Sequence, residues 1–126
     1  MISLKGVLKR NPRDSEMAPK VYASAQHGAK LDLDELATAV AERCSLRRPD
    51  VYGVLVGLMD IIPNELLKGN IISLGQLGSF YVSVKSEGVE TIDEMTPSMV
   101  TGNKIQYRPT KELKKKLRMI DVSIAD

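Results

Sequence analysis

The stretch from Leu67 to Gly88, LKGNIISLGQLGSFYVSVKSEG, constrains the fold more than any other part of the sequence. Its apolar residues alternate with polar ones as in a β-strand, and yet it contains glycines at 69, 75 and 78. Glycine weakens a strand unless the backbone needs a conformation that other residues disfavour. Gly69 is therefore interpreted as the end of a preceding helix, and Gly75 with Gly78 as a tight turn that leads the chain into a sheet.

Two helices are predicted before this turn. Asp32 followed by Glu35 is typical of a helix N-terminus at which both side chains cap backbone amides. This first helix is expected to end near Cys44, with the cysteine on its apolar stripe and in the core. Pro49 fits the first turn of a second helix, whose apolar face is broader than one partner helix needs. Pro63 is expected to kink that helix or to begin a separate last turn.

After the glycine turn, a hairpin is predicted. Residues 80–85 alternate apolar and polar side chains, and residues 104–108, KIQYR, supply a returning strand. The segment between them is polar and rich in turn residues, with Pro97 interpreted as a turn proline and Gly102-Asn103 as a turn. This connection forms a short arm.

The two ends of the chain add smaller elements. Residues 3–10 and 21–25 have strand-like patterns with a loop between them, and Thr110 is the natural cap of a basic C-terminal helix. His27 is interpreted as a loop residue. The expected division is an N-terminal extension over 1–30, a main domain over 31–120 and a C-terminal tail over 121–126.

Composition narrows the class of function. The chain has 126 residues with 43% hydrophobic but only 4% aromatic residues, so its core is thin and an oligomer is favoured. One cysteine excludes an intrachain disulfide and a zinc site built from several thiolates. No phosphate loop, paired carboxylate or metal-ligand spacing is present, so we expect no enzyme, metal, cofactor or small-molecule substrate. No apolar run is long enough to cross a membrane, and we expect a cytoplasmic protein.

Charge is distributed unevenly, although the net charge is only +2. Between Thr101 and Met119 there are seven Lys or Arg residues and one acidic residue, Glu112. The arm before this segment contains only acidic charges, which are Glu87, Glu90, Asp93 and Glu94. A cationic helix of this kind is either a phosphate-binding surface or an ordinary solvated face, and the pattern alone leaves both open.

Taken together, these motifs resemble the HU and integration host factor family of bacterial DNA-bending proteins over roughly residues 32 to 118. The family's G-F-G-[ST]-F turn is matched by Gly75-Gln76-Leu77-Gly78-Ser79-Phe80, with Leu77 in place of the first Phe. Its F-x-x-G-K-x-L-K motif is matched by residues 107–114, with Thr110 in place of Gly. The N-terminal extension resembles the HU-like group of Bacteroidetes-type bacteria.

The resemblance implies an α+β, HU-like fold. Two N-terminal helices would form the base of an intertwined homodimer, followed by a β-sheet meander with a short arm, a basic C-terminal helix and extra N-terminal strands. It also implies a histone-like architectural protein of the nucleoid, whose partners are duplex DNA, bound largely without sequence specificity, and a second copy of itself. In the family, basic arms carry an Arg-Asn-Pro tip whose proline wedges between base steps. Here the arm is acidic, and Arg10-Asn11-Pro12 echoes that tip in another place.

The expected DNA contacts combine two strands and a helix. Their alternative reading is the polar face of a sheet together with a solvated helix. The residues are Lys85, Lys104, Gln106, Arg108, Lys111, Lys114 and Lys115. Because the arm is acidic, a second function also stays open, in which the HU fold serves as a protein-interaction or structural module with weak or lost DNA binding.

Overall fold

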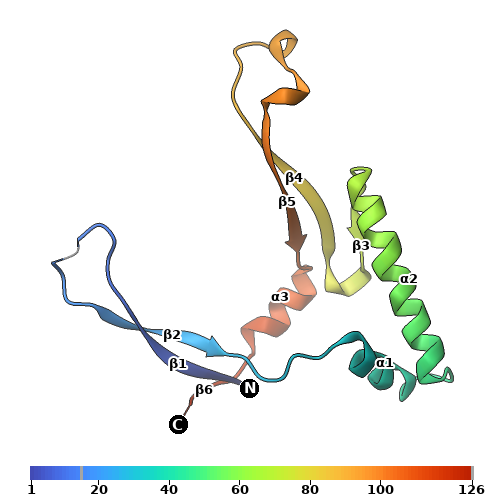
Figure 1. Ribbon diagram of the computed structural model, residues 1–126. Coiled ribbons are helices and arrows are strands. Elements are labelled where there is room, and N and C mark those ends of the chain that lie inside the picture. The colour runs from blue at the N-terminus through green and yellow to red at the C-terminus, as the bar shows by residue number, and fades with distance from the viewer. Residues whose placement is uncertain (15, 126) are drawn as a thin grey trace. The chain divides into compact units, whose positions relative to one another are not determined.

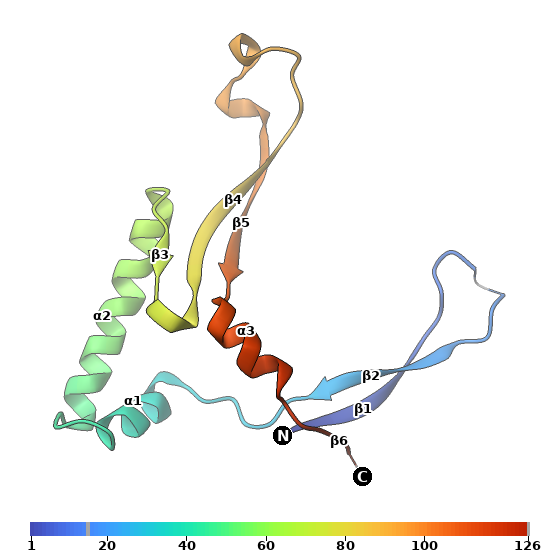
Figure 2. The ribbon, with the colours of Figure 1, turned by 180° about the vertical axis from the view of Figure 1, so that it is seen from behind.

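The computed structural model of the chain describes residues 1–14 and 16–125 and is a mixed α+β protein. Figures 1 and 2 show it from opposite sides. Its α-helices and strands are β1 (Ile2–Lys9), β2 (Lys20–Gln26), α1 (Leu33–Ala41), α2 (Arg48–Leu67), β3 (Ile72–Ser73), β4 (Ser79–Ser86), β5 (Val100–Arg108), α3 (Lys111–Arg118) and β6 (Val122–Ile124). The chain divides into two compact units: unit 1 is Met1–Lys30 with the segment that begins at Lys115, and unit 2 is Leu31–Lys114.

Unit 1 contains a three-stranded sheet with the order β2-β1-β6. The two predicted strands, β1 and β2, pair as an antiparallel hairpin, and β6 pairs in parallel with β1 from Ile2 opposite Val122 to Leu4 opposite Ile124. The backbone amide of Ala125 extends this pairing by donating to the carbonyl of Leu4 at 2.8 Å. The sequence pattern did not predict β6, because three residues are too few to show a strand period.

In unit 2, α1 begins as predicted and ends earlier than expected. The Asp32 carboxylate accepts a hydrogen bond from the Glu35 amide at 2.9 Å, which confirms this half of the expected cap. After Ala41 the chain tightens, and the amide of Arg43 donates to the carbonyl of Val40 three residues back. Cys44 therefore lies beyond the helix and is exposed, so its predicted place in a core was wrong.

The second helix, α2, runs without interruption from Arg48 to Leu67 and contains Pro63 in its interior. Of the two effects expected of Pro63, a separate last turn is contradicted, and a kink stays a prediction. Pro49 lies in the first turn as expected. Gly69, with φ of +85°, ends the helix as predicted, and the amide of Asn70 donates to the carbonyl of Glu65. The Asn70 side chain also donates to the Glu65 carboxylate at 2.7 Å, and this hydrogen bond, with a further one from Lys68, lowers the pKa of Glu65.

The glycine turn has the geometry that the sequence predicted. Gly75 and Gly78 have φ of +60° and +129°. Gly75 begins a single 3₁₀ turn, Gly75–Leu77, and Gly78 follows it directly. A Cβ atom on Gly78 would lie 2.3 Å from the carbonyl oxygen of Arg108. Both the backbone conformation and the close approach of β5 therefore require glycine at position 78.

The second sheet, in unit 2, has the strand order β3-β4-β5, and its longest ladder joins β4 to β5. The predicted turn at Gly102-Asn103 was wrong, because these residues lie inside β5 opposite Lys85 and Val84. The actual connection spans residues 87–99 and contains two 3₁₀ turns, of which the second begins at Pro97. We call residues 87–99 the arm.

Few side chains of the described residues are buried. The buried hydrophobic residues are Ala37, Val51 and Leu66, and all three belong to α1 and α2. Other apolar residues of these helices remain open, for example Val54 at 59% and Ile61 at 58% exposure. None of the described helices combines the length and the apolar character that crossing a membrane requires.

Candidate nucleic-acid interface

The four strand residues predicted to contact DNA share one face of the β4–β5 ladder. Lys104 lies opposite Ser83, Gln106 lies opposite Tyr81, and Lys85 faces Gly102. Side chains of residues two apart in a strand point to the same side, and residues opposite each other do so as well. Lys85, Lys104, Gln106 and Arg108 therefore form one surface, which we call the basic strand face.

Neighbouring side chains hold two members of this face in place. The Arg108 guanidinium lies over the ring of Tyr81, with 5.4 Å between its carbon and the ring centroid. The Gln106 amide nitrogen donates to the Ser83 hydroxyl at 3.2 Å, in a partly buried position. The Tyr81 ring thus supports the Arg108 guanidinium on this face. One of the two amide donors of Gln106 is already used in the hydrogen bond to Ser83.

The opposite face of the same ladder is apolar. The rings of Phe80 and Tyr107 pack with centroids 5.0 Å apart, and the Tyr107 hydroxyl donates to the carbonyl of Leu77 at 2.6 Å. Farther along the ladder, Val82 and Ile105 line a cavity of about 560 Å³ beside the end of α2. The alternation of the strands therefore separates a face suited to packing from a face suited to anions.

The first turn of α3 follows β5 directly and carries further cationic residues. The Thr110 hydroxyl accepts a hydrogen bond from the amide of Leu113 at 3.2 Å, which confirms the predicted cap. The same hydroxyl donates to the carbonyl of Gln76 at 2.6 Å, so the start of the helix is tied to the glycine turn. Lys111 and Lys114 are exposed and three residues apart, and therefore lie on one side of the helix.

Lys115 is the one predicted contact outside unit 2. It is exposed and follows Lys114 on α3, at the point where the chain passes into unit 1. Lys115 is four positions after Lys111, so it lies close to the side of the helix that carries Lys111.

The cations of the basic strand face and of α3 have no acidic partner within the described residues. In residues 1–14 and 16–125, the ion pairs are Arg48 with Asp34 and Lys68 with Glu65. The same part of the chain holds no cluster of His, Cys, Asp or Glu that could bind a metal ion. Positive charges without a carboxylate partner among these described residues can attract an external anion.

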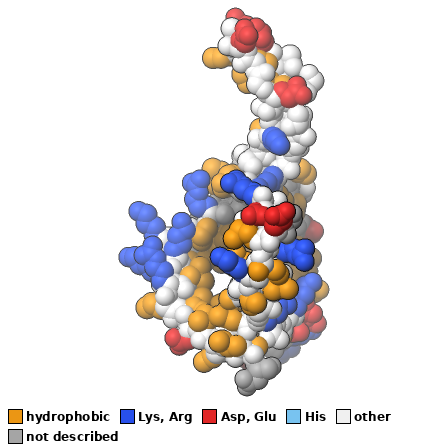
Figure 3. Space-filling model, turned by 90° about the vertical axis from the view of Figure 1, so that its left-hand side faces the viewer, with side chains coloured by type: hydrophobic (Ala, Val, Ile, Leu, Met, Phe, Trp, Pro, Cys, Tyr) orange, Lys and Arg blue, Asp and Glu red, His pale blue; other side chains and the backbone are white. Residues whose placement is uncertain are grey.

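The arm differs in charge from the strands that support it. Figure 3 shows acidic side chains at the far end of the arm. Exposed apolar side chains accompany them, including Ile92 at 83% and Met95 at 59% exposure. The basic strand face is therefore confined to the ladder and does not extend along the arm.

Sequence reasoning missed the role of Tyr81. Its ring supports Arg108, and its position opposite Gln106 places it on the same face. Strand alternation from Lys85 backwards would have indicated Tyr81, but only the register places it beside Arg108.

Comparison with known proteins adds a family and a similar fold. A family model described as "HU domain fused to wHTH, Ig, or Glycine-rich motif" matches residues 3–123. A crystal structure from Bacteroides vulgatus ATCC 8482, provisionally described as a bacterial DNA-binding protein, has a TM-score of 0.60 and 14% sequence identity. The similarity covers 97% of this chain and 47% of that one, so this chain spans about half its length. No curated protein sequence is significantly similar to this chain.

Proposed function

The chain belongs to the family of HU domains fused to other modules, and from this premise we propose that it is an architectural protein of the nucleoid that binds duplex DNA. The observation that carries the proposal is the basic strand face, on which Lys85, Lys104 and Arg108 gather without a carboxylate partner among the described residues. The exposed lysines of α3 add to these positive charges.

The chemistry of these residues favours phosphates over base edges. Lysine and arginine neutralise phosphate charges and release condensed counterions, which binds duplex DNA of any sequence. Gln106 could read a base, but its amide already donates to Ser83. We therefore propose binding with little sequence preference and a structural rather than a catalytic role.

A homodimer is part of the proposal. The described residues bury only three hydrophobic side chains, and all three belong to α1 and α2 of unit 2. A second copy packed against α1 and α2 would cover apolar side chains such as Val54 and Ile61, which are now exposed to water.

The test is duplex binding as a function of salt. We expect the variant Arg108→Ala/Lys111→Ala/Lys114→Ala to bind a random duplex more weakly than the wild type. The slope of log K against log salt should fall by about 0.9 for each lost contact, so by up to about 2.7 for this variant. Fluorescence anisotropy at several salt concentrations measures both quantities.

A matched control removes the same charge elsewhere. Lys30, Arg43 and Arg47 are exposed and have no carboxylate partner within residues 1–14 and 16–125. Their triple replacement by Ala should leave the slope within experimental error of the wild type. Equal slopes for the two triple variants would overturn the proposed contact surface, and a monomeric mass by light scattering would overturn the dimer.

A protein-interaction module is the second candidate. It is favoured by the arm, in which exposed Ile92 and Met95 stand among four carboxylates. Acidic groups repel phosphates, whereas an acidic and apolar surface suits a basic protein partner. Absence of duplex binding by the wild type at low ionic strength would support this candidate and contradict the first.

A further inference from the structure

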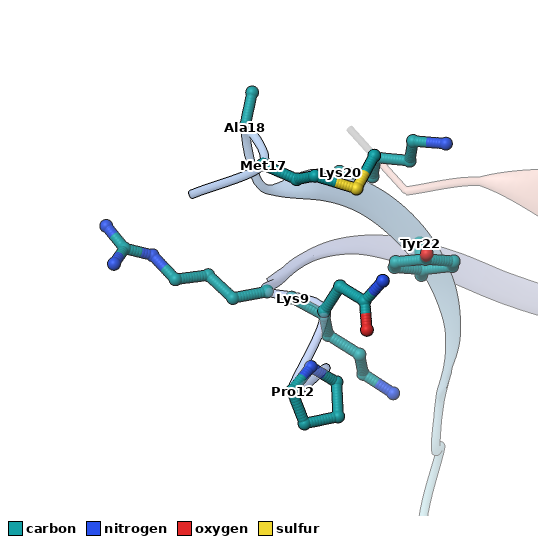
Figure 4. Close-up of a pocket in the computed structure, with 8 residues that line it drawn as sticks. Lys9, Pro12, Met17, Ala18, Lys20 and Tyr22 are labelled. Carbon is teal, nitrogen blue, oxygen red and sulfur yellow. The ribbon is translucent and has the colours of Figure 1, made fainter. Parts of the chain in front are cut away.

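The end of the β1–β2 hairpin, in unit 1, carries a second cationic surface that the proposed site does not include. A cavity of about 410 Å³ lies there, and the charged residues that line it are all basic: Lys9, Arg10 and Lys20. Tyr22 and Asn11 line it as well. Figure 4 shows Lys9, Lys20 and Tyr22 at the hairpin end. We call Lys9, Arg10 and Lys20 the hairpin cations.

The strand register places two of the hairpin cations opposite each other. Lys9 lies directly opposite Lys20 in the last pair of the ladder, and Tyr22 lies on the same face, opposite Val7. Like charges directly opposite each other destabilise a pair of strands. No carboxylate within the described residues forms an ion pair with either lysine.

The acidic residues of the loop do not neutralise the hairpin cations. Asp14 uses a carboxylate oxygen to accept the backbone amide of Glu16 at 3.1 Å, and neither residue lines the cavity. Asn11 accepts the amide of Arg13 through its side chain at 3.0 Å, which fixes the turn just after Arg10. The side-chain acceptors of Asn11 and Asp14 are thus hydrogen-bonded to the backbone of the loop itself. The hairpin cations remain exposed.

The arrangement selects an extended anion over a small one. In Figure 4 the ammonium ends of Lys9 and Lys20 point away from each other and do not converge on one point. The Lys9 ammonium lies 6.0 Å from the centroid of the Tyr22 ring, which is 50% exposed. Separated cations beside an open ring match a duplex, each of whose strands carries one phosphate per about 3.4 Å of helix axis, better than a single phosphate ion.

We propose that the hairpin cations are a second DNA-backbone contact, used together with the basic strand face. This inference rests on the proposed function, because it takes duplex DNA as the ligand. It assigns a role to the N-terminal strands: they carry positive charge to phosphates that the acidic arm is unsuited to contact.

The experiment measures duplex affinity of the full chain across salt concentrations. The variant Lys9→Ala/Arg10→Ala/Lys20→Ala should bind more weakly than the wild type, and its salt slope should be smaller by up to about 2.7. All three side chains are exposed, so the variant is expected to fold. Circular dichroism checks this. A charge-preserving variant, Lys9→Arg/Lys20→Arg, should retain the wild-type slope.

The outcomes separate the two sites. A hairpin variant that binds like the Lys30/Arg43/Arg47 control overturns the inference and leaves the proposed function intact. Loss of affinity in the hairpin variant, with no loss in the Arg108/Lys111/Lys114 variant, supports the hairpin contact and overturns the contact surface proposed on the strands and α3. Displacement of duplex by millimolar inorganic phosphate at constant ionic strength would also overturn the inference, because it would indicate a small-anion site.

Discussion

Two hairpins of this protein carry opposite charge at their ends. Residues 9–20, which are the β1–β2 loop with the last residue of β1 and the first of β2, contain four Lys or Arg residues and two acids. Residues 86–100, which are the arm with the corresponding strand residues of β4 and β5, contain four acids and no base. Both are antiparallel ladders, and therefore the backbone does not decide which of them can approach a polyanion. The side chains at the hairpin end decide it.

The two hairpins also differ in how their strands are anchored. The β4–β5 ladder is fixed at its base, where the Tyr107 hydroxyl donates to Leu77 and the Thr110 hydroxyl donates to Gln76. Neither hairpin contains a buried residue among its described strand residues, but residues 79–83 of β4 are all half-buried, whereas β2 is exposed except at Ser24, with Val21 at 69% exposure. A hairpin with less packing depends more on its ladder, so we expect the β1–β2 hairpin to open more easily than β4–β5.

The largest expected effect is on the free energy of unfolding, and it tests whether the two hairpins differ in anchoring. Gly78→Ala should lower the free energy of unfolding by about 2–4 kcal/mol, because φ is unfavourable and the new Cβ would overlap the carbonyl of Arg108. Gly6→Ala should cost about 1 kcal/mol or less, since its Cβ would meet only the movable end of the Val21 side chain. Urea unfolding at one fixed protein concentration measures both variants. Equal losses would show that β4–β5 is not the more rigid hairpin.

A smaller effect tests the contrast in charge. Neutralising the arm with Glu87→Gln/Glu90→Gln/Asp93→Asn/Glu94→Gln should tighten duplex binding a few-fold at low salt, and the gain should vanish at high salt, because long-range repulsion is screened. Anisotropy titrations at two salt concentrations measure this. Unchanged affinity at low salt would indicate that the arm stays far from the DNA.

The smallest effect concerns the turn that links α2 to the anchored sheet. Hydrogen bonds from Asn70 and Lys68 lower the pKa of Glu65 from its ordinary 4.5. A carboxyl with a lowered folded pKa stabilises the fold above its unfolded pKa, and this contribution is lost as pH falls through the folded pKa. Asn70→Ala should therefore raise the pKa of Glu65 toward 4.5, as measured by NMR titration, with Lys68 left in place. An unchanged pKa would show that Asn70 does not stabilise the carboxylate in solution.

Much of the fold could be predicted from local signals. The cap at Asp32, the helix stop at Gly69 and the turn at Gly75 and Gly78 each follow from a backbone requirement that one or two residues satisfy. The error at Gly102-Asn103 arose because nonlocal pairing overrides local preference. Gly102 favours a turn by itself, but pairing with β4 keeps it in a strand.

The sequence by itself identified the candidates for the proposed DNA contact, because it places cations beside the glycine turn and acids in the arm. Only the tertiary structure decided which of them act together. Shifting β5 by one residue would turn Lys104 and Arg108 to the apolar side, and it is the pairing of Ser83 with Lys104 that sets the register. The same holds for Lys9 and Lys20, which are far apart in sequence and are brought opposite each other by the β1–β2 ladder.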